Sequence, residues 1–466
     1  VISGAGIEYR EVGQQFFRAY YVVLAIAIYV VVPFGAFRSM LGERDLHTWE
    51  VLSITTLKPR QIVWGKLTSA VVQLFIYYSA ITPFIAFANL LKGIDVPTIA
   101  FVLVASMFWS LALSMLALAL STFGSQRYWQ VFLTLGVLGG LLMGMFTSIS
   151  IVFWGIEAGF PFDEPGFWWV VALIASFVVV YCLLALQIAV SQLTFDADNR
   201  SSGIRIAAAG IFWLGLAWFG TSMLLQGVWG LPSFPVSDLD EVVMTFTSLA
   251  GLHWFVVGLF AATESDVLSR RVRRDIQRLG AFRVLAAPLI PGGSRGLVFF
   301  LAHVSLLFAF VSVVSWSLGL MGTQVILYAA GVWCYLVIYI GFGAAFGRAA
   351  RAVSGDFRPA HTRVLTVLFL ALASILPLTL YAFDSVRLSA QPNPLLFVTD
   401  PFSTLYRLAE GNLWSNEILL AIGAAAFVSI LFNLRAMLAG VSDVARTYIP
   451  PAPAAPGEIA PQAVGR

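Results

Sequence analysis

Apolar residues form long runs along the chain, and short polar segments separate these runs. A membrane-spanning helix needs about 20 predominantly apolar residues. Eleven runs approach that length, at 17–37, 67–91, 98–121, 129–154, 167–193, 204–227, 242–262, 296–318, 323–346, 364–383 and 415–437. Only 11% of the residues are charged, against roughly 25% in soluble domains. The sequence therefore predicts an all-α polytopic membrane protein with about eleven visible spanning helices.

Lysine and arginine gather in alternate connectors between the runs. One set of connectors holds Arg38, Arg44, Lys58, Arg60, Lys66, Arg127, Arg200, Arg205, Arg270, Arg271, Arg273, Arg274, Arg278, Arg283, Arg295, Arg348, Arg351, Arg358 and Arg363. The other set holds only Lys92, Arg387 and Arg407. Because basic residues collect on the cytoplasmic side, we expect the first set and the C-terminus to face the cytoplasm. The expected location is a bacterial inner (plasma) membrane.

This orientation places the start of the chain outside the cytoplasm. We therefore expect a further spanning helix before Val1, which gives twelve helices arranged as two six-helix units. The expected organisation is a first unit at 1–193, a cytoplasmic linker at 194–203, a second unit at 204–440 and a disordered Pro/Ala-rich tail at 441–466.

Ionisable side chains are scarce inside the apolar runs: His253 and His303 lie within runs, and Glu417 lies near an outer end. Ion-coupled carriers place carboxylates or basic groups near the midplane of the bilayer, so this scarcity argues against that class. The histidines match no metal-binding or catalytic motif. We therefore expect no catalytic residue, metal ligand or cofactor in this chain.

The pair Gly65-Lys66 is reminiscent of a phosphate-binding loop. That motif needs a glycine five positions before Gly65, where Arg60 stands, and a Ser or Thr where Leu67 stands. We therefore expect that the chain is not an ATPase, and not an enzyme.

The polar segment 43–67, ERDLHTWEVLSITTLKPRQIVWGKL, follows the first run. Its pattern predicts two short helices. Glu43 and Asp45 would open the first, since acidic residues favour a helix N-terminus, and Pro59 suits the first turn of the second. Gly65 would allow close approach of a neighbouring helix, and Lys66 would reach the head groups.

This segment resembles the cytoplasmic loop after the second helix of ABC type-2 exporter permeases. The resemblance rests on Glu43, Arg44, Thr48, Glu50, Leu52, Thr55, Leu57, Pro59, Arg60, Ile62, Gly65, Lys66 and Leu67, and it extends over roughly residues 17–193. Trp49 and His47 depart from the family pattern. The resemblance implies a coupling helix that docks on a separate ABC ATPase, expected in two copies, which binds the ATP and magnesium. The implied coupling residues are Glu43, Arg44, Thr48, Trp49, Glu50, Leu52, Pro59, Arg60, Gly65 and Lys66.

A second basic loop, ESDVLSRRVRRDIQRLGAFRV, falls where a repeated unit would carry its own coupling segment. Its Arg density also suits contact with anionic lipid. The candidate residues for either role are Asp266, Arg270, Arg271, Arg273 and Arg274.

The resemblance implies an ATP-driven exporter permease. Its expected partners are the ATPase, the lipid bilayer and either a second permease chain or a second copy of this chain. We expect no nucleic acid among them. Two alternatives stay open: a non-transporting accessory protein docked to an ATPase, and a polytopic enzyme acting on lipid-linked substrates. Gln73, Tyr77, Tyr78, Ser79 and Thr82 are candidates to line a polar path for the cargo.

Overall fold

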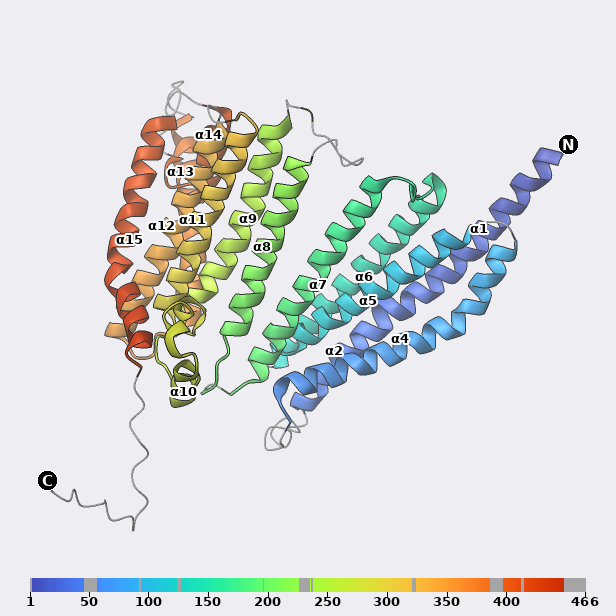
Figure 1. Ribbon diagram of the computed structural model, residues 1–466, viewed down its shortest axis with the longest axis horizontal. Coiled ribbons are helices and arrows are strands. Elements are labelled where there is room, and N and C mark those ends of the chain that lie inside the picture. The colour runs from blue at the N-terminus through green and yellow to red at the C-terminus, as the bar shows by residue number, and fades with distance from the viewer. Residues whose placement is uncertain are drawn as a thin grey trace, which may run out of the picture. The chain divides into compact units, whose positions relative to one another are not determined.

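The computed structural model describes residues 2–45, 57–91, 94–123, 127–195, 197–225, 235, 238–320, 324–385, 397–411 and 415–447. These residues form helices and contain no strand (Figure 1). Eleven of the described helical stretches are long and apolar enough to cross a membrane, and each coincides with one of the eleven predicted runs. The predicted all-α polytopic membrane fold is therefore confirmed, and the twelfth helix stays a prediction.

The chain divides into two compact units, Val1–Phe195 with Gly203–Leu239 (unit 1) and Asp196–Ser202 with Asp240–Arg466 (unit 2). Unit 1 comprises α1 (Ile2–Ile26), the π-helical turn η1 (Ala27–Val31), α2 (Val32–Asp45), α4 (Pro59–Leu90), α5 (Val96–Ser121), α6 (Arg127–Ala158), α7 (Pro165–Leu193) and α8 (Ser202–Leu224). Unit 2 comprises α9 (Leu239–Ala261), α10 (Arg270–Arg278), the 3-10 turns η3 (Gly280–Arg283) and η4 (Ala287–Leu289), α11 (Gly293–Ser317), α12 (Gln324–Val353), α13 (Pro359–Ser385), α14 (Pro401–Glu410) and α15 (Ser415–Ala445).

Helix α8 groups with unit 1, although we expected it to open the second unit. It packs on α7 through two tryptophans. The Trp218 and Trp169 rings lie 4.7 Å apart edge to face, and Trp218 Nε1 donates to Ser176 Oγ at 2.9 Å. These contacts bind α8 to the helix that precedes it in the chain.

Helices α1, η1 and α2 form one continuous helix through the core of unit 1, where Phe17, Tyr21 and Ile28 are fully buried. The prediction that Glu43 and Asp45 open a separate helix is wrong, because both belong to the last turn of α2. The apolar pattern continues past Phe37 through Met40 and Leu41, all buried, and no proline interrupts it, so the spanning helix extends to Asp45.

In unit 2 the spanning helices run side by side, with α10 at one end of the bundle and α14 at the other (Figure 1). Helix α15 runs to Ala445, so the predicted disorder of 441–466 is wrong for its first five residues. Val444 is fully buried against Val272 and Ile276 of α10, and this packing keeps the last turn helical. The remainder of the predicted tail from Tyr448 lies outside the described residues.

Small residues bring α12 close to its neighbours. A Cβ at Gly343 would lie 2.4 Å from Thr366 Oγ1, and a Cβ at Gly347 would lie 2.4 Å from Thr362 Oγ1. Gly341 is covered in the same way by Ser429 of α15. Helix association in membranes depends on such close approach, so the Gly343-xxx-Gly347 spacing sets the packing of α13 on α12.

Candidate functional site

The predicted coupling segment joins the end of α2 to the start of α4. Glu43 and Arg44 lie in the last turn of α2, where only the backbone is described. Pro59, Arg60, Gly65 and Lys66 lie in the first two turns of α4. The predicted coupling residues Thr48, Trp49, Glu50 and Leu52 lie outside the described residues.

The start of α4 is capped as the sequence indicates. Lys58 is the N-cap residue, and its backbone N–H donates to Gln61 Oε1 at 2.8 Å. Pro59 occupies the first turn, which confirms its predicted place. This cap fixes the point at which the chain re-enters the helix bundle.

Lys66 connects α4 to α2 through a hydrogen bond. Its ammonium group donates to the Ser39 carbonyl of α2 at 3.3 Å. Among the described residues, a Cβ at Gly65 would meet no atom within 4 Å, so the close helix packing expected at Gly65 stays a prediction. Arg60 and Trp64 are exposed one turn apart on this end of α4, and Leu57, just before the helix, is exposed as well.

A proline explains the π-helical turn higher in the same helix. Val32 N–H donates to Ala27 O, five residues back. In this register the Ile28 carbonyl would need the N–H of residue 33, which is Pro33 and has none. The buried Ser110 hydroxyl of α5 donates to Ile28 O instead. Sequence reasoning missed this site, although Pro33 inside an apolar run marks it.

Three further hydroxyls meet beside this turn. Ser148 Oγ of α6 donates to Tyr29 Oη at 2.8 Å and lies 3.0 Å from Tyr21 Oη. Both tyrosines are buried in the core of unit 1. The turn, Ser110, Tyr21, Tyr29 and Ser148 form what we call the π-turn cluster. π-Helical turns gather at functional sites and act as local points of bending.

Three of the residues predicted to line a polar path make hydrogen bonds with known partners. Tyr78 hydrogen-bonds across to α5, at 2.8 Å from Ser106 Oγ. Ser79 donates to Ile76 O and Thr82 donates to Tyr78 O, both within α4. These contacts do not test the path, which stays a prediction.

The second basic loop separates into two groups of residues. Asp266 accepts from Ser294 N and Oγ, both at 2.8 Å, so it holds the start of α11. Arg271 pairs with Asp198 at 3.0 Å, and Arg273 lies 3.9 Å from Asp443 of α15. Arg270 and Arg274 are exposed, as is Arg271 beside its pair with Asp198. The five predicted residues therefore divide into the partly buried Asp266 and Arg273 and three exposed arginines.

The sequence analysis gave no role to the segment PGGSRG at 291–296, which fixes this loop on the bundle. Glu264 Oε2 accepts from Gly292 N at 3.0 Å. Arg295, 1% exposed, donates to Pro291 O and Gly440 O and lies 3.8 Å from Asp443. The signal was present as paired glycines ahead of an arginine, where the chain must approach another backbone closely.

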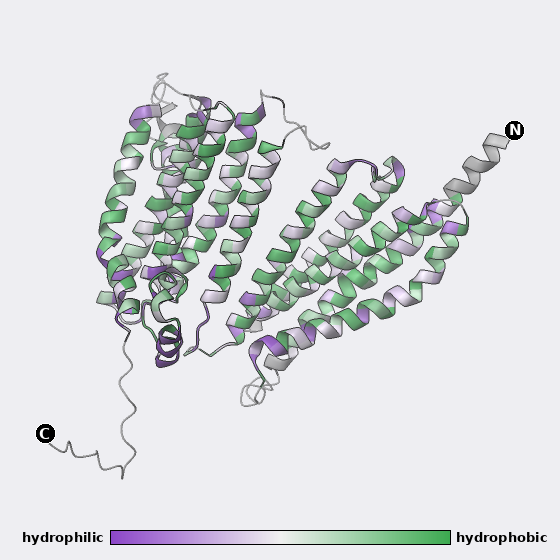
Figure 2. Ribbon diagram, viewed as in Figure 1, coloured by the Kyte–Doolittle hydropathy of each residue, from purple (hydrophilic) through white to green (hydrophobic). Residues whose placement is uncertain are grey.

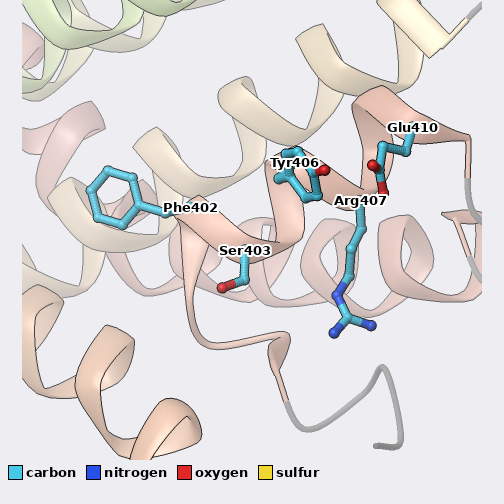
Figure 3. Close-up of a pocket in the computed structure, with 5 residues that line it drawn as sticks. All are labelled: Phe402, Ser403, Tyr406, Arg407 and Glu410. Atoms are coloured by element: carbon cyan, nitrogen blue, oxygen red, sulfur yellow. The ribbon is translucent and has the colours of Figure 1, made fainter. Parts of the chain in front are cut away.

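A hollow of about 510 Å³ lies on α14 (Figure 3) and is lined by Phe402, Ser403, Tyr406, Arg407 and Glu410. All five residues belong to one short helix. The hydrogen bond of Tyr406 to Glu410 raises the pKa of the Tyr406 hydroxyl, and the negative charge of Glu410 adds to this effect. The hollow is an open surface and contains no convergent buried polar group of the kind that ligand sites use.

Among the described residues no group of three or more His, Cys, Asp or Glu side chains could hold a metal ion. Comparison with protein-family models, curated proteins and solved structures finds no match to this chain. The class is defined by the architecture alone: this is a multi-pass α-helical membrane protein.

Proposed function

We propose that the chain is the transmembrane permease subunit of an ATP-driven exporter of the bacterial inner membrane. A separate ABC ATPase, present in two copies, would dock on the 43–67 segment. The observation that supports the proposal is that the 43–67 motif connects two spanning helices, α2 and α4, which a hydrogen bond of Lys66 also joins.

The hydrogen bond between Lys66 and Ser39 O gives a route for mechanical coupling. A displacement of the 43–67 segment acts on the end of α2 and the start of α4 together, because Lys66 joins them. Helix α2 continues into η1 and the π-turn cluster. Nucleotide-driven closure of the ATPase would therefore bend the spanning helix at the turn where its hydrogen-bond ladder is already interrupted.

Co-purification and an ATPase assay in liposomes test the proposal. The full chain is affinity-purified from its native membrane, and mass spectrometry identifies the proteins that co-purify. The complex is then reconstituted in liposomes. We expect an ABC ATPase to co-purify and to hydrolyse ATP. Arg60→Glu reverses the charge of an exposed candidate docking residue and should abolish co-purification, as should Glu50→Ala.

Arg358→Glu is the matched control, since Arg358 is exposed in a different connector of the same predicted side. This variant should retain the ATPase. Absence of any ABC ATPase from the intact complex, or equal recovery with all three variants, would refute the proposal. An ATPase that binds and hydrolyses ATP without vectorial movement of any cargo would instead indicate a non-transporting accessory protein.

A further inference from the structure

The segment between α9 and α11 carries an exposed surface that the proposed function does not use. Its apolar part is Leu279, Phe282 and Leu285, which are 41%, 74% and 80% exposed. Its basic part is Arg270 and Arg274 of α10. We call these five residues the α10–η3 surface. Figure 2 shows α10 as a strongly hydrophilic element at one end of unit 2.

Backbone hydrogen bonds bring two of the apolar residues close together. Leu279 N donates to Ile276 O and Phe282 N donates to Leu279 O, both at 3.1 Å, so consecutive three-residue turns follow α10. The hydrogen bond from Phe282 N to Leu279 O closes a turn, which brings the backbones of Leu279 and Phe282 close together. Gly280, with φ +54°, allows the change of direction where α10 ends.

The two arginines are available for a ligand. Arg270 and Arg274 are one helical turn apart, and neither makes an ion pair with another described residue. The opposite face of α10 is occupied, because Val272 and Ile276 are buried against Ile290 and Val444. The helix is therefore anchored on the protein and presents its basic side outward.

The whole segment is clamped to the ends of two spanning helices. Glu264 and Asp266 hold the backbone of Gly292 and Ser294, and a Cβ at Gly293 would meet the Glu264 carbonyl at 2.6 Å. Since the apolar helices α9 and α11 meet this segment at their ends, we expect the exposed apolar residues to lie near the edge of the bilayer.

We propose that the α10–η3 surface binds the anionic lipid of the adjacent leaflet. Leu279, Phe282 and Leu285 insert at the level of the glycerol backbone, and Arg270 and Arg274 bind lipid phosphates. An interfacial surface of this composition combines apolar burial with electrostatic attraction to anionic head groups. The inference is independent of any ATPase.

Fluorescence quenching in nanodiscs tests the proposal. The native cysteines Cys182 and Cys334 are replaced by alanine, and a bimane label is attached to Leu285→Cys in the full chain. The nanodiscs contain phosphatidylcholine alone or with increasing phosphatidylglycerol, plus a nitroxide-labelled lipid. Both leaflets have the same composition, so the result does not depend on orientation. We expect lipid quenching to rise, and iodide quenching to fall, as phosphatidylglycerol increases.

Arg270→Gln with Arg274→Gln should weaken this response. Two arginines near an anionic surface correspond to roughly a 30-fold change in association. The control pair, Arg358→Gln with Arg435→Gln, removes the same charge elsewhere in unit 2 and should leave it intact. A label at Ser354→Cys, in the α12–α13 connection, should show no dependence on phosphatidylglycerol.

Equal quenching in both lipid compositions, or an unchanged response after loss of Arg270 and Arg274, would overturn the proposal. Protection of the Leu285 label only when an ATPase subunit is added, in phosphatidylcholine alone, would also overturn it and identify the surface as a protein-docking site.

Discussion

Gly293, at the start of α11, lies directly against the backbone of Glu264. A Cβ at Gly293 would come 2.6 Å from Glu264 O and 2.8 Å from Ala262 O. Both obstacles are backbone atoms just after the end of α9, and they cannot rotate away as a side chain would. We therefore expect Gly293→Ala to lower the free energy of unfolding by about 1–3 kcal/mol. Thermal unfolding of the detergent-solubilised chain measures the change.

Gly423→Ala is the control for this substitution. Gly423 lies on α15 of the same unit, and a Cβ there would meet nothing within 4 Å. Alanine also favours a helix over glycine, so this variant should unfold at the same temperature as the parent chain or slightly higher. Equal losses of stability for the two variants would contradict the close contact at Gly293.

The packing of α13 on α12 allows a double-mutant cycle. Gly343→Ala places a Cβ 2.4 Å from Thr366 Oγ1 and 3.1 Å from Thr366 Cγ2. We expect this variant to lose about 1–3 kcal/mol of stability through overpacking. Thr366→Ala removes both obstructing atoms, so the double variant should be more stable than the sum of the single changes predicts. Strictly additive unfolding free energies would show that the two residues do not meet.

Two buried serines on α5 differ in the carbonyl that accepts the hydrogen bond of their hydroxyl. The Ser110 hydroxyl is the partner of Ile28 O in the π-helical turn, whereas the Ser114 hydroxyl donates within its own helix, to Ser110 O, at 2.8 Å. Ser110→Ala leaves the Ile28 carbonyl buried without a donor, which costs about 1–3 kcal/mol. Ser114→Ala removes a hydroxyl whose acceptor belongs to a regular helix, so its effect should be smaller. Denaturant unfolding of both variants measures the difference, and a larger loss for Ser114→Ala would refute this account of the turn.

The pattern of apolar runs was sufficient to predict every described span, because a long helix must satisfy its own backbone in a bilayer. It was insufficient at helix ends. α2 continues to Asp45 and α15 to Ala445, since buried residues such as Met40 and Val444 extend the packing beyond the apolar run. A hydropathy pattern measures the lipid-facing length of a helix and not its full length.

The candidate site was harder to predict because its contacts join residues far apart in the chain. Lys66 reaches Ser39, and Ser110 reaches Ile28, across a distance in sequence that no local pattern covers. The basic loop illustrates the same difficulty. Its four predicted arginines look alike in the sequence, and only the structure pairs Arg271 with Asp198 and places Arg273 near Asp443.

Lys66 and Arg60 should affect ATPase coupling in different ways, given the proposed function. Arg60 is exposed one turn before the exposed Trp64, so Arg60→Glu should prevent the ATPase from binding. Lys66→Met keeps the apolar stem but removes the hydrogen bond to Ser39 O. It should therefore leave the ATPase bound while uncoupling its hydrolysis from the spanning helices. Co-purification measures the first effect, and the transport-to-hydrolysis ratio in liposomes measures the second. Loss of ATPase binding by Lys66→Met would contradict this account. It would show that Lys66 contacts the ATPase itself and does not act by joining α2 to α4.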